Sequence, residues 1–243
     1  MPTNLLLSII IPAYNEALRL PQTLPEIVRF VNDQSFEAEV IIVDNNSSDD
    51  THNIASQFAG EHAFIRVLTE PIQGKGAAVR KGMLNAEGNY IFMADADLSM
   101  PIQEVTKFIP PELDGYDVAI GSREVKGAVR YDEPGYRHLM GRIFNLVVKV
   151  LAVPGFQDTQ AGFKCFRKSI ALDILACQQI QGWAFDVELL FIARKRGYQI
   201  VEVPIHWYFR ENSRISPLKD AMDMFQEVVR IRRNDMRGLY DPE

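Results

Sequence analysis

The sequence contains little of what marks zinc proteins, disulfide-linked secreted proteins or membrane-spanning proteins. Its two cysteines, Cys165 and Cys177, lack Cys-x-x-Cys spacing and its four histidines are scattered, so we expect no zinc site and a reduced, intracellular chain. No run reaches the roughly 18 apolar residues that a membrane-crossing helix needs. The start of the chain has neither the charge nor the cleavage site of a signal peptide. We expect a soluble protein, or one that lies on a membrane without crossing it.

Signatures of nucleic-acid and dinucleotide binding are also absent. The net charge is −6, which does not favour nucleic acid as a partner. No Gly-x-Gly-x-x-Gly follows the first apolar run, and the GKG at 74–76 lacks the preceding glycine and the following Ser or Thr of a P-loop. These absences exclude two common ways of holding phosphate.

What the sequence does show is alternation of short apolar runs with helical patterns. The runs predicted to be buried strands are 5–11, 39–44, 64–69, 90–95 and 117–122. This order predicts an α/β fold with a doubly wound, mostly parallel sheet and helices on both faces. Ligands of such sheets bind beyond the carboxyl ends of the strands.

The regular alternation stops after about residue 125. A loop, a long helix, the segment GFKCF, two further helices and a strand over 199–209 are predicted to follow. We expect residues 1–215 to form one catalytic domain, with 216–243 adding a C-terminal amphipathic helix and tail to the same domain.

Two acids, Asp95 and Asp97, stand at the predicted end of the strand over 90–95. Alternation along a strand would point both the same way. Two like charges so close are costly unless one takes a proton or a cation lies between them, and Mg²⁺ or Mn²⁺ prefers such oxygen ligands. The alternative is a solvated turn in which Asp97 or Ser99 caps a helix starting near Pro101.

Other residues near predicted strand ends have the chemistry to hold a ligand. Pro12 is predicted to stop the first strand, and Tyr14 offers a stacking face unless it is simply a half-buried aromatic. Asp44 can accept a hydrogen bond from a base or a ribose, or it caps the next helix. Lys75, near a helix N-terminus, suits an anionic ligand or is simply solvated.

Five segments resemble, in order, the motifs of family 2 glycosyltransferases with the GT-A fold. They are SIIIPAYNEALRLPQTL, EVIIVDNNSSDDT, QGKGAAVRKGM, MADADLSMP and AIGSR. In the second half, DTQAGFKCF (158–166) and GWAFDVELLFIA (182–193), followed by VEVPIHW, are similar to the dolichyl-phosphate β-glucosyltransferases and, less closely, to the dolichyl-phosphate mannose synthases. The resemblance covers about residues 5–215. The C-terminal spans of some relatives and the N-terminal anchor of the eukaryotic glucosyltransferases are not expected here.

The resemblance implies transfer of one sugar, with inversion, from a nucleotide-diphosphate donor to a dolichyl or other polyprenyl phosphate. The residues that would hold the nucleotide are Pro12, Ala13, Tyr14, Glu16, Asp44, Lys75 and Asp95. Asp95 and Asp97 would hold Mg²⁺ or Mn²⁺. Some related mannose synthases have a glutamine two residues after the second acid. Ser99 stands there in this chain, which leaves a third protein ligand in doubt.

The acceptor phosphate has a second pKa of about 6, so it is mostly a dianion near neutral pH. Such a nucleophile needs cations more than it needs a base. The resemblance assigns this role to Arg123 and Arg137, whose guanidinium groups suit phosphate. Other candidates in the second half are Asp158, Lys164, Asp186 and Trp183. Asp158 would bind sugar hydroxyls or orient the arginines, Lys164 would contact the acceptor, Asp186 would lie beside the sugar or acceptor, and Trp183 would be a sugar platform or a core residue.

Two helices bear on membrane contact at the cytoplasmic face. The segment 143–156 is apolar nearly all round, and a polyprenyl acceptor favours lipid contact through Phe144, Val148 and Leu151. The terminal helix has an apolar stripe formed by Leu218, Met222, Phe225 and Val229. We predict that this stripe packs against the protein. The basic residues at its end could instead lie on anionic lipid.

Other classes of function remain open at this point. The acceptor could be water-soluble, such as a sugar or glycerate, and the chain could be a nucleotide-binding module without activity, although Asp95, Asp97 and Arg123 argue against that. A glycoside hydrolase also needs two acids, but the nucleotide motifs would then have no role. The second-half segments favour UDP-glucose over GDP-mannose as donor.

Overall fold

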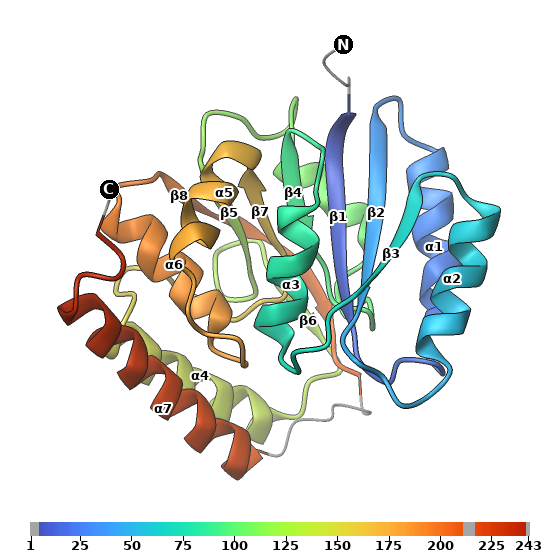
Figure 1. Cartoon of the computed structure of the whole chain (residues 1–243). Coiled ribbons are helices and arrows are strands. Elements are labelled where there is room, and N and C mark those ends of the chain that lie inside the picture. Colours follow the sequence, from blue (N-terminus) through green and yellow to red (C-terminus); the bar gives the residue numbers. More distant parts are fainter. Residues whose placement is uncertain (1–4, 211–216, 242–243) are drawn as a thin grey trace.

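The computed structural model describes residues 5–210 and 217–241 (Figure 1). The strands are β1 (Leu5–Ala13), β2 (Glu37–Asp44), β3 (Ile65–Thr69), β4 (Tyr90–Met93), β5 (Val118–Ser122), β6 (Val129–Tyr131), β7 (Lys164–Arg167), β8 (Ile200–Pro204) and β9 (His206–Tyr208). The helices are α1 (Leu20–Asn32), α2 (Thr51–Glu61), α3 (Lys75–Leu84), the 3₁₀ helix η1 (Ile102–Phe108), α4 (Gly135–Leu151), α5 (Lys168–Cys177), α6 (Phe185–Lys195) and α7 (Pro217–Met236).

A seven-stranded sheet in the order β3-β2-β1-β4-β7-β5-β8 organises the fold. All its strands are parallel except β7, which pairs antiparallel with both β4 and β5. Helices α1, α2 and η1 pack on one face, and α3, α5 and α6 pack on the other (Figure 1). The predicted mostly parallel sheet with helices on both faces is confirmed. The GFKCF segment supplies the antiparallel strand, which the sequence pattern did not reveal.

The central strands are buried on both faces. Ile9, Ile10 and Ile11 in β1 are completely inaccessible to solvent, which explains why the strand is apolar without alternation. The prediction that Pro12 stops the first strand is wrong. The strand β1 continues to Ala13, which pairs with Asp44. Proline is tolerated here because β4 ends opposite Ile10, so Pro12 has no neighbour on that side.

Three other elements differ from expectation. The strand over 90–95 ends at Met93, and the acids that follow lie in a turn. The helix suggested to start near Pro101 is the 3₁₀ helix η1. The single strand predicted over 199–209 is divided at Ile205 into β8, in the main sheet, and β9, which pairs with β6 in a separate two-stranded sheet. Beyond Ile205 the chain leaves the edge of the main sheet and pairs, as β9, with β6 in the loop after β5.

Helices α4 and α7 pack together beside the lower edge of the sheet in Figure 1, where β1 ends. The predicted packing of the α7 stripe is wrong for Met222 and Phe225, which are exposed, because α7 instead turns Val228 and Ile231 inward. The residues suggested for lipid contact also change. Val148 is fully buried, whereas Leu146 and Val150 of α4 are exposed.

Some predicted positions fall outside what the structure describes. These are the side chains of Ile143, Phe144 and Leu218, and the whole of residues 211–216. Within residues 5–210 and 217–241, no helix combines the length and the apolar character that crossing a membrane requires.

Candidate active site

The loops after β1 and β2 are joined by side chains from both. The backbone N–H of Asn15 donates to Ser47 Oγ at 2.9 Å, and the N–H of Ser48 donates to Asn15 Oδ1 at 2.8 Å. The Glu16 N–H donates to Thr51 Oγ1 at 2.7 Å. Asn15 has a φ of 54°, a conformation that asparagine tolerates better than most residues. The PAYNE and NNSSDDT segments are therefore one structural unit.

Asn45 extends this unit to the segment before α3, and our reading of the sequence did not single it out. Its Nδ2 donates to the carbonyl oxygens of Glu70 and Ile72 at 3.0 and 2.7 Å, and its Oδ1 accepts from the Gly74 N–H at 2.8 Å. The signal was its place directly after Asp44, where amide side chains commonly organise turns. Through these bonds Asn45 holds the segment that leads into Lys75.

The predicted nucleotide-binding residues lie along this unit with different exposures. Tyr14 is 44% exposed, and its hydroxyl oxygen accepts a hydrogen bond from Gln73 Nε2 at 3.4 Å. Glu16 forms an ion pair with Arg19 at 3.0 Å. Asp44 is buried, accepts from the Ser47 N–H at 3.1 Å, and lies 3.5 Å from His52 Nδ1. Of this set, Tyr14 presents the most surface.

Pro12 and Ala13 contribute mainly backbone to the same edge. Ala13 is buried, and its carbonyl oxygen accepts from the Asn45 N–H at 2.8 Å. They therefore shape the edge beneath Tyr14.

Asp95 and Asp97 lie in a tight turn just beyond β4. The Leu98 N–H donates to the Asp95 carbonyl at 3.2 Å, Leu98 has a φ of 46°, and the Ser99 N–H donates to Asp97 Oδ1 at 2.9 Å. Strand alternation therefore does not explain how the two acids are placed. The turn does, and it leaves both carboxylates partly exposed.

Lys75 is the direct counter-charge of this turn. Its Nζ lies 2.5 Å from Asp95 Oδ1. Burial disfavours the charge on Lys75, but attraction from Asp95 and from the nearby Asp186 outweighs burial and raises the pKa of Lys75. Burial likewise opposes the charge on Asp95, yet Lys75 foremost and then Lys164 lower the pKa of Asp95. Both groups are therefore charged at neutral pH.

The donor set of this turn fits Mg²⁺ or Mn²⁺. Such ions often take only one or two protein carboxylates and complete their shell with water and phosphate oxygens. Asp95 and Asp97 supply two carboxylates; among the described residues no group of three or more His, Cys, Asp or Glu side chains could hold an ion. The segment before β7 closes on the turn, and even a methyl group at Gly162 would collide with the Asp95 carboxylate.

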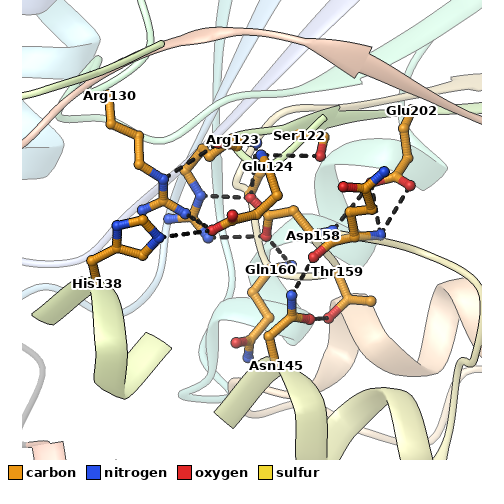
Figure 2. A network of polar contacts seen from close by, with 12 residues as sticks. Ser122, Arg123, Glu124, Arg130, His138, Asn145, Asp158, Thr159, Gln160 and Glu202 are labelled. Atoms are coloured by element: carbon orange, nitrogen blue, oxygen red, sulfur yellow. Dashed lines mark hydrogen bonds and ion pairs between the residues drawn. The ribbon is translucent and has the colours of Figure 1, made fainter. Parts of the chain in front are cut away.

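A second charged cluster surrounds Arg123, just after β5 (Figure 2). Asp158 accepts from Arg123 Nε at 2.6 Å, from Nη2 at 3.0 Å, and from the Arg123 backbone N–H at 3.1 Å. Burial opposes the charge on Asp158, but these contacts outweigh it and hold the pKa of Asp158 far below the ordinary range. Asp158 is almost inaccessible to solvent, which favours the predicted role of orienting Arg123 over the predicted contact with sugar hydroxyls.

Arg123 is also supported from the side of β9 and the loop after β5. The ring centroid of Trp207 lies 5.4 Å from Arg123 Cζ and 5.8 Å from Arg130 Cζ. Arg130 pairs at 2.6 Å with both Glu124 and Glu133. Cation–π contact and paired acids limit the positions that the two guanidinium groups can adopt.

Asp186 and Lys164 lie beneath the two clusters. Lys164 Nζ is 3.1 Å from Asp186 Oδ2 and donates to the Ala161 carbonyl at 2.7 Å. The Lys164 side chain is fully buried, and its predicted contact with the acceptor stays a prediction. It acts on its surroundings through Asp186 and through its attraction to Asp95.

The remaining predicted residues lie on α4 and before α6. Arg137 belongs to α4, but its side chain is outside the described residues. Trp183 is substantially exposed, and its ring centroid lies 5.7 Å from Lys75 Nζ. It is thus a surface residue beside the Lys75–Asp95 pair, not a core tryptophan.

Comparison with known proteins is in accord with this arrangement. The sequence profile of the family described as "Glycosyl transferase family 2" matches residues 8–175. The dolichyl-phosphate beta-glucosyltransferase of Dictyostelium discoideum is 34% identical over 98% of this chain and 77% of its own length. The human enzyme of the same name is 32% identical over 96% of this chain and 77% of its own length.

Solved structures agree on the fold. Glucosyl-3-phosphoglycerate synthase from Mycobacterium tuberculosis, in complex with uridine diphosphate, superimposes with a TM-score of 0.67 at 19% identity, over 93% of this chain and 78% of that chain. Mannosyl-3-phosphoglycerate synthase from Rubrobacter xylanophilus gives 0.67 at 19% identity, over 96% and 75%. With its GT-A fold and its match to the family profile over most of its length, the chain is a glycosyltransferase and belongs to glycosyltransferase family 2.

Proposed function

We propose that this protein transfers glucose from UDP-glucose to dolichyl phosphate, or to a related polyprenyl phosphate, with inversion at the anomeric carbon. The observation that carries the proposal is the proximity of two charge systems at one sheet edge. The partly exposed acids Asp95 and Asp97 suit a metal-bound diphosphate, and Arg123 lies close enough to Asp95 to help lower its pKa. The names of the relatives supply the sugar and the lipid class.

The reaction breaks the bond between the anomeric carbon and the UDP oxygen, while an acceptor phosphate oxygen forms the new bond from the opposite face. A divalent cation, when bound, stabilises the charge on the departing diphosphate. The acceptor is already a dianion near neutral pH, so no side chain has to remove a proton. Arg123, together with Arg137, positions it against the repulsion of the donor phosphates.

The residues at the other end of the edge would bind the donor. Tyr14 offers its exposed ring and Asp44 its carboxylate to the nucleoside, while Pro12, Ala13 and Glu16 shape the edge. Lys75 lies next to Asp95 and Trp183, where its charge can meet the diphosphate or the sugar. Asp186, held by Lys164, would lie beside the sugar or the acceptor.

The assay is incubation with labelled UDP-glucose or GDP-mannose, with and without a polyprenyl phosphate, followed by extraction into organic solvent. We expect glucose label in the organic phase only when the lipid phosphate is present. Mannose label there would reassign the donor. Label that appears only in a water-soluble product, as with glycerate or sugar acceptors, would replace the lipid by a soluble acceptor.

We also propose peripheral contact with the cytoplasmic face of a membrane through α4 and α7. The supporting observation is the exposure of Leu146 and Val150 on α4 and of Met222 and Phe225 on the adjacent α7. The four exposed arginines in or just after the second half of α7 are Arg230, Arg232, Arg233 and Arg237. Two unpaired cysteines fit a reducing compartment.

Sedimentation with anionic liposomes separates the two contributions to membrane contact. Each arginine near an anionic surface contributes about 1 kcal/mol that salt screens, so binding should weaken at high salt and when all four arginines are replaced by Gln. Replacing Leu146 and Phe225 by Ser should weaken the binding that survives high salt. Failure of the wild type to sediment at any salt concentration would overturn this part of the proposal.

A further inference from the structure

The segment that carries Asp158 is braced by two residues outside the reaction described above (Figure 2). Glu202, in β8, accepts from the Gln157 N–H at 3.0 Å to Oε1 and 2.9 Å to Oε2, and from the Asp158 N–H at 3.1 Å to Oε1. Asn145, in α4, donates from Nδ2 to the Gln157 carbonyl and accepts from Thr159 Oγ1 at 3.1 Å. Two elements far apart in the chain thus hold three consecutive residues.

Those three residues fix the orientation of Arg123. Asp158 engages Arg123 through Nε and Nη2, a planar two-point contact that leaves little rotational freedom. The direction in which the remaining Nη1 points is therefore set by the position of Asp158. That position depends on the backbone of 157–159, which lies in an irregular segment between α4 and β7. This segment belongs to no strand, so sheet hydrogen bonds do not hold it.

We propose that Glu202 and Asn145 are positioning residues for binding of the acceptor phosphate, and that they act through Asp158 and Arg123. The inference rests on the proposed function, because it takes Arg123 as a contact of that phosphate. Among the described residues, neither Glu202 nor Asn145 forms a hydrogen bond or ion pair with Arg123, so their influence passes through the 157–159 segment. A carboxylate that accepts several backbone N–H groups is held strongly, and misplacement by about 1 Å can cost roughly a hundredfold in rate.

The first test measures apparent KM for the polyprenyl phosphate and for UDP-glucose in the full-length chain. Glu202→Gln keeps the size of the side chain but removes its charge, and we expect the acceptor KM to rise about tenfold with the donor KM changed less than twofold. Thr159→Val removes one hydroxyl bond to Asn145 and keeps the volume; a rise of about threefold in acceptor KM is expected. Glu37→Gln, on an exposed glutamate at the start of β2, is the matched control and should change neither value.

The second test is a double-mutant cycle between Glu202 and Asp158. If Glu202 acts only through Asp158, Glu202→Gln should change the acceptor KM by less than twofold once Asp158→Asn is present. Independent structural roles would instead give multiplied effects. Multiplied effects, or equal shifts in donor and acceptor KM, would overturn the proposal.

The same variants separate this inference from the proposed function. If Arg123→Ala and Asp158→Asn leave acceptor use intact, the assignment of the acceptor site is wrong and the positioning role falls with it. If those two variants weaken acceptor use while Glu202→Gln and Thr159→Val do not, the acceptor site stands and only the positioning role is overturned. Thermal melting of each variant excludes loss of fold as the cause.

Discussion

The acids on the two sides of this site have different surroundings. Asp95 has 29% of its side chain exposed and pairs with Lys75, whereas Asp158 has 3% exposed and pairs with Arg123. The partners are exposed to a similar degree, at 23% and 21%. The difference therefore lies in the acids. An exposed acid can exchange its partner for a ligand, while a buried acid fixes the direction of its partner.

This contrast would explain how one edge holds the two phosphate-bearing substrates of the proposed reaction, which repel each other. On the donor side of the proposed site, the carboxylates would attract a cation that brings the diphosphate with it. On the acceptor side, Arg123 pairs with the Asp158 carboxylate, and in the proposed site its guanidinium group would face the acceptor phosphate. Opposite polarity of the two presented surfaces would keep each substrate in its own place.

The largest expected effect comes from removing Asp97, the partly exposed acid that forms no ion pair with another described residue. Asp97→Asn should lower turnover about a thousandfold, because loss of metal-based charge stabilisation costs several kcal/mol. The melting temperature should stay the same or rise, since the change relieves repulsion from Asp95. EDTA should abolish transfer by the wild type, and Mg²⁺ or Mn²⁺ should restore it.

The matched control for this prediction is Asp33→Asn, on an exposed aspartate after α1, which should leave turnover unchanged. Full activity of Asp97→Asn, or activity of the wild type in EDTA, would remove the metal from the mechanism and with it the first half of the comparison.

The next largest effect should come from the cationic groups on the acceptor side. Arg123→Ala and Arg137→Ala should each raise the acceptor KM between about ten- and a hundredfold, because hydrogen bonds to charged groups contribute about 1.5–3 kcal/mol. The affinity for UDP, measured by calorimetry, should change less than twofold. The control is Arg29→Ala, which changes an exposed arginine of α1 that is far from Arg123 and Arg137 in the sequence. An equal fall in UDP affinity would move both arginines to the donor diphosphate.

The sequence predicted the donor side of the molecule better than the acceptor side. Strand ends near residues 13, 44 and 93 follow from local apolar runs, and the topology of a parallel sheet brings such ends together. Their positions were right to within two residues. The acids at 95 and 97 could thus be placed at the sheet edge without knowing any contact.

The acceptor side depends on contacts between distant segments that have no periodic pattern. Glu202 contacts Gln157 and Asp158, which lie 45 and 44 positions earlier in the chain. Nothing in the sequence IVEVP distinguishes its carboxylate from a solvated one. The burial of Lys164 has the same origin, because Lys164 begins the short antiparallel strand β7, which is inserted between β4 and β5 in the sheet. Only the assembled sheet shows which charges it covers.

The smallest expected effect concerns stability, and it tests whether Asp158 is a buried partner. Asp158→Asn should lower the free energy of unfolding by about 2 kcal/mol at pH 7, less than the roughly 3–5 kcal/mol of a fully broken buried pair because the amide keeps part of the contact. Burial opposes ionisation of Asp158, but Arg123 holds its pKa below the ordinary 3.8. A lowered pKa stabilises the native state above pH 3.8 and loses that contribution as the pH falls toward the native pKa. The deficit of the variant should therefore narrow by about 1 kcal/mol between neutral pH and pH 3 in denaturant titrations. In Asp33→Asn no such narrowing is expected, and a deficit in Asp158→Asn that stays constant from pH 7 to pH 3 would show that the pair with Arg123 is not what the buried carboxylate stabilises.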